Sequence, residues 1–294
     1  MIRLLVTGRN GQLATSLGLR AAATGIAVIA AGRPELDLEH PASVEKAIAA
    51  ARPDIVVNAA AYTAVDQAEQ EAGRAYAVNC AGAEAAAQAA ARLGVPFIHL
   101  STDYVYPGDK AGPYVETDTT GPLGIYGKSK LAGEIAVRDA HARALILRTS
   151  WVYSPFGANF VKTMLRVGRQ RDLVSVVDDQ IGNPTSALDL AGAILAIAPE
   201  LVDSGGMAAT FHLCGKGEAS WYGFAREIFA VSGRLGGPHP KVRAIATAEY
   251  PTPARRPANS RLSTAAFNRQ FGFELRPWTE AVADTVGLLL KSGS

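Results

Sequence analysis

Short apolar runs alternate with helix-like segments along the first half of the chain. Strand-like apolar runs, two of which end at glycine, occupy residues 2–8, 26–32, 54–61, 95–103 and 144–153. Segments typical of helices lie between them, at residues 9–25, 42–51, 72–93 and 126–140. Buried strands that alternate with helices predict an α/β fold: a doubly wound, Rossmann-like parallel sheet with right-handed crossovers and helices on both faces.

The pattern loosens after about residue 155. Residues 176–186 cluster Asp, Gly, Asn and Pro and predict a loop, and the prolines of 252–262 exclude regular structure there. Residues 186–198 and 220–233 predict helices, the second capped by Ser220. A short strand is expected at 210–215. We therefore predict a dinucleotide-binding domain at 1–155 and a smaller α/β portion at 156–294, partly interleaved with the first, which binds substrate over the carboxyl ends of the strands.

Composition narrows the class of protein. The net charge is +2 and the basic residues are dispersed, apart from Arg255 and Arg256, so neither nucleic acid nor a membrane surface is an expected partner. Two distant cysteines, Cys80 and Cys214, form neither a disulfide framework nor a metal cluster. With no apolar run of 18 residues and no signal peptide, a cytoplasmic protein is expected.

A glycine-rich turn follows the first predicted strand. Gly8 permits a tight turn, Gly11 lets the backbone approach a diphosphate, and Ala14 is small enough for close helix packing. The spacing is G-x-x-G-x-x-A, and a plain strand-to-helix turn is the simpler interpretation. Its place at the first strand-to-helix junction favours dinucleotide binding at the helix N-terminus.

The second predicted strand lacks the acidic residue that binds a ribose 2′-hydroxyl. Arg33 stands there instead, and an arginine accommodates a 2′-phosphate, which favours NADPH over NADH without excluding NADH. We expect Asp37 and Leu38 to flank the adenine.

Tyr126 and Lys130 form a Y-x-x-x-K pair in the helix predicted at 126–140. Residues four apart share one helix face, so the ammonium would lower the pKa of the phenol and tune a proton donor. Thr102, at the end of the fourth predicted strand, could hydrogen-bond the tyrosine or a substrate carbonyl. A lone Y-x-x-x-K is common by chance, so the pair counts only together with the glycine turn and Thr102.

Together these motifs resemble the extended short-chain dehydrogenase/reductase superfamily. Further blocks resemble its dTDP-4-dehydrorhamnose reductase family: "NAAAYTAVDQAE" (58–69), "STDYVY" (101–106), "YGKSKLAGE" (126–134), "LRTSWVY" (147–153), "DDQIGNPT" (178–185) and "YPTPARRPANSRL" (250–262). The resemblance implies an NAD(P)H-dependent oxidoreductase of dTDP-rhamnose biosynthesis, a carbohydrate-biosynthesis pathway. Such an enzyme reduces the C4 keto group of dTDP-4-dehydro-L-rhamnose to dTDP-L-rhamnose.

The resemblance also implies roles for individual residues. Tyr126 would protonate the C4 oxygen, Lys130 would lower the Tyr126 pKa and hold the nicotinamide ribose, and Thr102 would orient the carbonyl. Cofactor contacts are expected from Gly11, Gln12, Leu13, Ala61, Tyr62 and Thr63. Substrate contacts are expected from Thr102, Asp103, Trp151, Asn183 and Arg256, the last as a diphosphate site that Arg255 shares. Some family members bind Mg²⁺ at a dimer contact through glutamates that cannot be placed here, so metal and homodimer stay open.

Two alternatives remain from the sequence. A nucleotide-sugar epimerase or dehydratase would share the glycine turn and Y-x-x-x-K, but a dehydratase typically has Asp-Glu after the threonine, where this chain has Asp103 and Tyr104. A non-catalytic regulatory subunit, similar to the β subunit of methionine adenosyltransferase, would not need Tyr126, Lys130 and Thr102 together.

Overall fold

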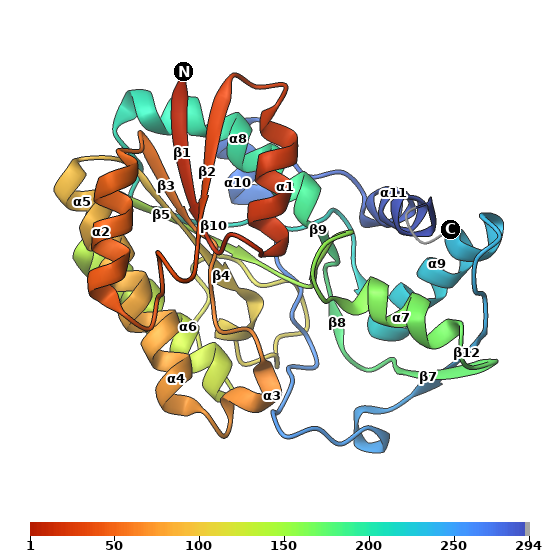
Figure 1. Ribbon diagram of the computed structural model, residues 1–294. Helices are drawn as coiled ribbons and strands as arrows, with labels where there is room; N and C mark the ends of the chain where they lie inside the picture. The colour runs from red at the N-terminus through yellow and green to blue at the C-terminus, as the bar shows by residue number, and fades with distance from the viewer. Residues whose placement is uncertain (292–294) are drawn as a thin grey trace.

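A computed structural model describes residues 1–291 and contains the predicted parallel sheet. The sheet has six strands in the order β10-β5-β4-β3-β1-β2, and every neighbouring pair is parallel (Figure 1). The strands are β1 (Ile2–Thr7), β2 (Ile26–Ala31), β3 (Ile55–Asn58), β4 (Phe97–Thr102), β5 (Ala144–Thr149) and β10 (Ala209–His212). The α/β fold class is confirmed.

Helices cover both faces of this sheet, as expected for a doubly wound fold. One face packs against α1 (Gln12–Ala21) and α8 (Ala187–Ser204), and the other against α2 (Pro41–Ala51), α5 (Ala83–Leu93) and α6 (Ile125–Ala140). Neighbouring residues of one strand, Leu4 and Leu5, belong to the two opposite cores and are both fully buried. Strands buried on both faces explain the continuous apolar runs in the sequence.

The alanine-rich segment is not one regular helix. It consists of α4 (Ala72–Tyr76), a π-helical stretch η1 (Ala77–Gly82) and α5. Close packing explains its small residues: a Cβ at Gly82 would lie 2.4 Å from the Leu38 carbonyl oxygen, and one at Gly133 of α6 only 2.0 Å from that of Asn79. The π-helical turn carries Asn79, which becomes important at the site.

The strand order reverses between β1 and β3. The chain goes from β1 to β2 on one side, whereas β3, β4 and β5 follow on the other. In open α/β sheets the crevice at such a switch point, outside the carboxyl ends of the strands, is where ligands bind. The turn after β1, the segment after β3 and Thr102 at the end of β4 all lie at this edge.

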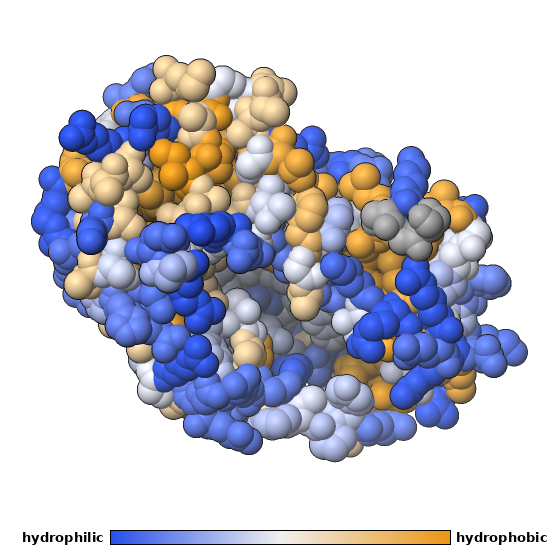
Figure 2. Space-filling model, in the orientation of Figure 1, coloured by the Kyte–Doolittle hydropathy of each residue, from blue (hydrophilic) through white to orange (hydrophobic). Residues whose placement is uncertain are grey.

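The C-terminal part forms a smaller lobe with its own apolar core around Phe224 and Tyr153. Its helices are α7 (Phe160–Gly168), α9 (Trp221–Arg234) and α11 (Trp278–Lys291), and β7 (Leu173–Val177) pairs with β12 (Lys241–Ile245). Ser220 caps α9 as predicted, because its hydroxyl accepts a hydrogen bond from Gly223 N at 2.9 Å. Figure 2 shows the molecule hollowed between the two lobes.

One expectation for this part was wrong. The loop predicted at 176–186 contains the end of β7 and two short strands, β8 (Ile181–Gly182) and β9 (Thr185–Ser186). Their partners, β11 (Ala219–Ser220) and β6 (Val152–Tyr153), are distant in sequence, so local composition does not reveal them. The strand expected at 210–215 is β10, at the edge of the main sheet beside β5. The boundary near residue 155 stays a prediction.

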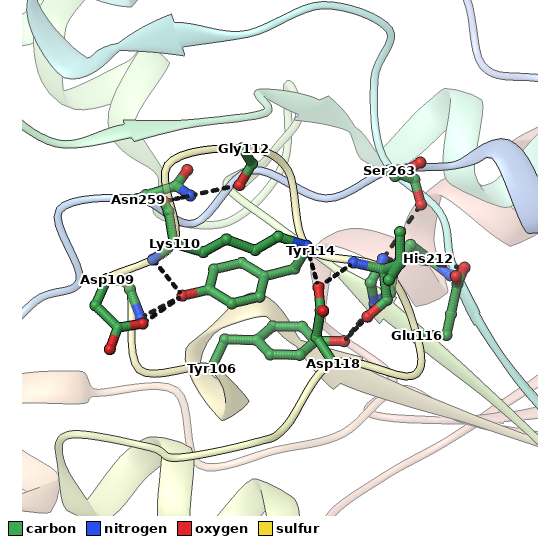
Figure 3. Close-up of polar contacts among 12 residues, drawn as sticks. Tyr106, Asp109, Lys110, Gly112, Tyr114, Glu116, Asp118, His212, Asn259 and Ser263 are labelled. Carbon is green, nitrogen blue, oxygen red and sulfur yellow. Dashed lines mark hydrogen bonds and ion pairs between the residues drawn. The ribbon is translucent and has the colours of Figure 1, made fainter.

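Residues 250–263, which we call the strap, are irregular as predicted and run from η3 (Thr247–Glu249) past α3 (Val65–Ala68) to α10 (Ala265–Phe271) (Figure 1). The strap bonds to β8 through Ile181 and to the segment at 106–118 through Tyr114. In Figure 3, the side-chain amide of Asn259, in the strap, donates hydrogen bonds to the carbonyls of Lys110 and Gly112. These two residues follow η2 (Asp103–Val105) in the sequence. Within residues 1–291, no helix is long and apolar enough to span a membrane.

Candidate active site

The glycine turn has the geometry of an anion cradle. Gly8 has φ +86° and donates its N–H to the Ala31 carbonyl, and a Cβ at Gly8 would lie 3.2 Å from that of Ala60. Gly11 begins α1, and no side chain within residues 1–291 caps this helix end. The first amides of α1 therefore face the switch point with the positive end of the helix dipole.

Gln12 and Leu13 can serve a cofactor only through their backbone. The Gln12 side-chain oxygen accepts hydrogen bonds from Ser154 and Asn159, at 2.8 and 3.0 Å, so it joins the turn to the start of the smaller lobe. The Leu13 side chain is buried in the core beneath α1. Their predicted cofactor contacts are thus limited to main-chain amides.

The segment after β2 contains the residues predicted to read the adenosine end. Arg33 is exposed, and a Cβ at the preceding Gly32 would lie 2.9 Å from that of Arg9. Asp37 is half-buried and accepts a hydrogen bond from the backbone N–H of Glu39. Leu38 is buried under η1, so its contact with a ligand would be through the backbone.

Residues 61–63 follow β3 and are anchored by a residue that sequence analysis missed. The Asn79 side chain accepts from Tyr62 N at 2.8 Å and donates to the Tyr62 carbonyl at 3.1 Å. It also donates to Ser129 of α6, whose hydroxyl bonds the Tyr126 carbonyl. Asn79 therefore couples the segment after β3 to α6, the helix that carries Tyr126 and Lys130. Ala61 is half-buried and Thr63 exposed beside it.

Thr102 and Tyr126 meet at the carboxyl end of β4. The Thr102 hydroxyl donates to Asp103 at 2.9 Å and accepts from Tyr104 N at 3.2 Å. Burial raises the pKa of Tyr126 to about 12, and the phenol lies within hydrogen-bond reach of Thr102. At neutral pH the phenol is therefore protonated, the form that a proton donor requires.

Lys130 is on the same helix but is directed into the sheet. Its Nζ donates to the Leu100 carbonyl at 2.7 Å and lies 3.4 Å from Nε2 of His99, and the residue is 2% exposed. Burial lowers the pKa of Lys130 to about 8. Burial of the phenol is the largest influence on the Tyr126 pKa, and the expected effect of Lys130 on that pKa stays a prediction.

Asp103 is an almost fully buried carboxyl beside Thr102. Burial raises its pKa to about 7, against hydrogen bonds from Ser260 and Thr102 that lower it. Its Oδ2 has no hydrogen-bond partner within residues 1–291. An unpartnered buried oxygen at the mouth of the site is suited to a sugar hydroxyl, which agrees with the predicted substrate role.

Trp151 takes a strained backbone conformation, with φ +46°. Its indole lies flat on Trp221 of α9, with ring centroids 3.5 Å apart and an angle of 6°. A Cβ at Gly182 would lie 2.5 Å from the same indole, so glycine is required there. The stacked pair, of which sequence analysis found only Trp151, joins the larger lobe to α9.

Asn183 and Arg256 have their side chains bonded within the protein. The Asn183 amide donates to the Gly217 carbonyl at 2.7 Å and accepts from Leu262 N at 2.8 Å. Arg256 makes a two-point contact with Asp66 of α3, at 2.7 and 3.0 Å. Composition cannot show that Asp66 binds Arg256, and the substrate contact expected of Arg256 stays a prediction. Arg255 is exposed and lines a small cavity with Tyr104 and Tyr126.

Comparison with known proteins decides the family. A family model described as the RmlD substrate binding domain matches residues 2–290. A dTDP-4-dehydrorhamnose reductase of Sinorhizobium fredii is 50% identical over 294 residues, and the match covers 99% of each chain. That of Escherichia coli is 44% identical over 248 residues, 84% of this chain and 83% of its own. The chain belongs to the dTDP-4-dehydrorhamnose reductase family.

Solved structures of the family have the same fold. A dTDP-4-dehydrorhamnose reductase of Clostridium acetobutylicum superimposes with a TM-score of 0.91 at 37% identity, covering 98% of this chain and all of that one. The Bacillus anthracis protein, in complex with NADP, gives 0.89 at 35% identity, with 97% and 98% covered. A UDP-glucose-4-epimerase of Stenotrophomonas maltophila gives 0.84 at only 17% identity, covering 100% and 99%, which shows a shared fold alone.

Proposed function

We propose that this chain reduces the C4 keto group of dTDP-4-dehydro-L-rhamnose to dTDP-L-rhamnose with NADPH. The observation that carries the proposal is the meeting of Tyr126 with Thr102 at the carboxyl end of β4, next to the switch point of the sheet. Family membership supports the same reaction, since relatives that match over 98% or more of the chain are named for it.

The residues present fit a dinucleotide. Gly8 and Gly11 leave room where any side chain would crowd Ala60 or the Gly8 carbonyl, and the uncapped start of α1 offers amides to a diphosphate. Ala61, Tyr62 and Thr63 would hold the nicotinamide side, and Lys130 its ribose. When bound, the dihydronicotinamide supplies the hydride that reduces the carbonyl carbon.

The protein's own side chains protonate and position the oxygen of that carbonyl. Negative charge grows on this oxygen as the carbon is reduced, and the Tyr126 hydroxyl donates the proton that neutralises it. Thr102 positions the phenol, and Asp103 with its unpartnered oxygen holds a neighbouring sugar hydroxyl. Trp151, braced by Trp221, offers a flat surface to the sugar ring.

The proposal extends to the choice of cofactor and to the location of the protein. Arg33 favours NADPH over NADH, because an exposed guanidinium after β2 can bind a 2′-phosphate. We place the protein in the cytoplasm as a dTDP-sugar enzyme. Within residues 1–291, no three metal-binding side chains gather in one place.

A coupled assay tests this function. The purified chain is given dTDP-4-dehydro-L-rhamnose with either NADPH or NADH, and the loss of reduced cofactor is followed by absorbance. We expect stoichiometric oxidation, faster with NADPH at limiting concentration. A sugar that is converted without cofactor loss would instead indicate an epimerase, and a chain that binds NADPH but converts nothing would indicate a regulatory subunit.

A further inference from the structure

A row of buried polar side chains crosses the sheet beneath the site. Thr7 ends β1, Asn58 ends β3, His99 lies in β4 and Lys130 in α6, and none of them is more than 2% exposed. The row connects the glycine turn to the catalytic helix. Buried polar groups must satisfy one another, so the hydrogen positions along the row can be worked out.

The row starts at Thr7, whose hydroxyl has a fixed direction. It accepts hydrogen bonds from the backbone N–H groups of Ala59 and Ala60, at 3.1 and 3.0 Å. A hydroxyl has two lone pairs and one proton, and both lone pairs are now used. Its proton must therefore go to the Asn58 side-chain oxygen, 2.7 Å away.

The orientation of the Asn58 amide decides which ring nitrogen of His99 carries a proton. Because its oxygen faces Thr7, its NH₂ group faces Nδ1 of His99 at 3.1 Å. An NH₂ group only donates, so Nδ1 carries no proton. Burial holds the pKa of His99 well below its usual range, so the ring is neutral and its one proton is on Nε2.

That Nε2–H faces Lys130 across 3.4 Å. An ammonium group has no lone pair, so the Nε2–H can hydrogen-bond Lys130 only when the lysine is a neutral amine. The other titratable groups on the Lys130 face of α6 are Tyr126, one turn earlier, and Glu134, one turn later. The Glu134 carboxylate favours the ammonium, but it is itself bound by Arg148 of β5.

We propose that His99 is a positioning residue for Lys130: its tautomer, imposed from the glycine turn through Thr7 and Asn58, disfavours the ammonium form of the lysine. The burial that lowers the pKa of Lys130 to about 8 acts in the same direction, and Glu134 opposes both. The row thus adds to the effect of burial on the charge of Lys130 and connects that charge to the turn at Gly8.

The first test is nuclear magnetic resonance of the full chain, because ¹⁵N shifts separate protonated from bare ring nitrogens. Two other histidines are internal standards. His141 must carry its proton on Nε2, since its Nδ1 accepts from Arg143 N while Nε2 donates to the Val95 carbonyl. His212 must carry its proton on Nδ1, which donates to the Ser263 carbonyl (Figure 3).

We expect the His99 signals, assigned by their loss in His99→Phe, to match the His141 pattern at neutral pH. A proton on Nδ1, as in His212, or on both nitrogens would overturn the proposal. This measurement uses the unmodified chain without substrate, and the variant serves only to assign the signals. Its result therefore does not depend on the proposed function.

The second test is the charge of Lys130, read from the ¹⁵N shift of its side chain during a pH titration without substrate. His99→Phe removes the facing N–H and keeps a planar ring, so the Lys130 pKa should rise by about half a unit to one unit. Thr7→Val leaves His99 and Lys130 intact and frees Asn58 to turn, so a smaller rise in the same direction is expected. An unchanged Lys130 titration in both variants would refute the coupling.

The catalytic consequence rests on the proposed function. If the ammonium is the active form, turnover falls as pH rises through about 8. In His99→Phe this fall in turnover should occur at a higher pH, displaced by the same amount as the Lys130 pKa. Tyr126 does not cause this limb, because its pKa is about 12. Should the titration shift while no reduction occurs in any form of the protein, the proposed function fails and the inference about Lys130 stands.

Discussion

Two ion pairs hold the two sides of the candidate site, and they differ greatly in burial. Beneath the sheet side, Arg148 binds Glu134 of α6 at two points, and their side chains are 4% and 0% exposed. On the strap side, Arg256 binds Asp66 of α3 at two points, with side chains 22% and 40% exposed. The first pair belongs to the folding core, whereas the second is a joint near the surface.

Because the two ion pairs differ in burial, their loss should affect different properties of the protein. Removing one partner of a buried pair leaves a charge without compensation, so the whole domain should respond. A half-exposed pair is screened by water and contributes little to global stability, so its loss should act on the strap and on substrate binding.

Glu134→Leu should destabilise the fold by about 3–5 kcal/mol, because it strands the Arg148 guanidinium inside the core. Urea-induced unfolding measures the loss. The double variant Glu134→Leu/Arg148→Met replaces both charges by apolar groups and should recover most of the stability. A single variant as stable as the parent would show that this buried pair does not hold the core together.

Asp103 lies where the two sides meet, and its stability contribution should depend on pH. Its folded-state pKa is raised to about 7, so the protonated carboxyl is favoured by folding: the benefit is full below about pH 4 and is lost as pH rises through about 7. Asp103→Asn cannot ionise. Between about pH 5 and pH 8, wild type should therefore lose about 3 kcal/mol relative to this variant. Denaturation at both pH values checks it, and parallel curves would contradict it.

Tyr126→Phe should lower turnover by about 10² or more while NADPH binding survives, since only the proton donor is removed. Tyr104 provides a matched control, because its ring stands edge-on to Tyr126 with centroids 5.7 Å apart. Tyr104→Phe removes a neighbouring hydroxyl and should cost less than about tenfold. Equal losses in the two variants would argue that both act through packing.

The sheet side was predictable from the sequence to a greater depth than the strap side. Gly8, Thr102 and Tyr126 stand at strand ends or on one helix face, so short-range periodicity places them. The predicted elements around them agree with β1, α1, β4 and α6 of the structure. What periodicity could not give is where buried side chains point, as Lys130 shows: its bond to Leu100 follows from the packing of α6 on β4.

The strap side depends on contacts between distant segments. Asp66 and Arg256 are 190 residues apart, and Trp151 finds Trp221 only once α9 packs against the larger lobe. Asn183 lies in a recognisable block, but its bonds to Gly217 and Leu262 are long-range as well. Sequence analysis identified these residues as important and assigned them to ligands, because the partners inside the protein leave no local signal.

The smallest expected effect decides how the strap works. Arg256→Ala should raise the KM for the sugar nucleotide up to about fivefold and change kcat less, since a half-exposed pair is worth about 1 kcal/mol. Asp66→Asn is the matched variant, because it weakens the same contact from α3 and leaves the guanidinium in place. If Arg256 acts by holding the strap, both variants raise KM together; if it binds the diphosphate directly, Asp66→Asn frees it and KM stays the same or falls. Steady-state kinetics with both variants therefore separates a structural joint from a substrate contact. The two-point contact between Arg256 and Asp66 favours the structural joint.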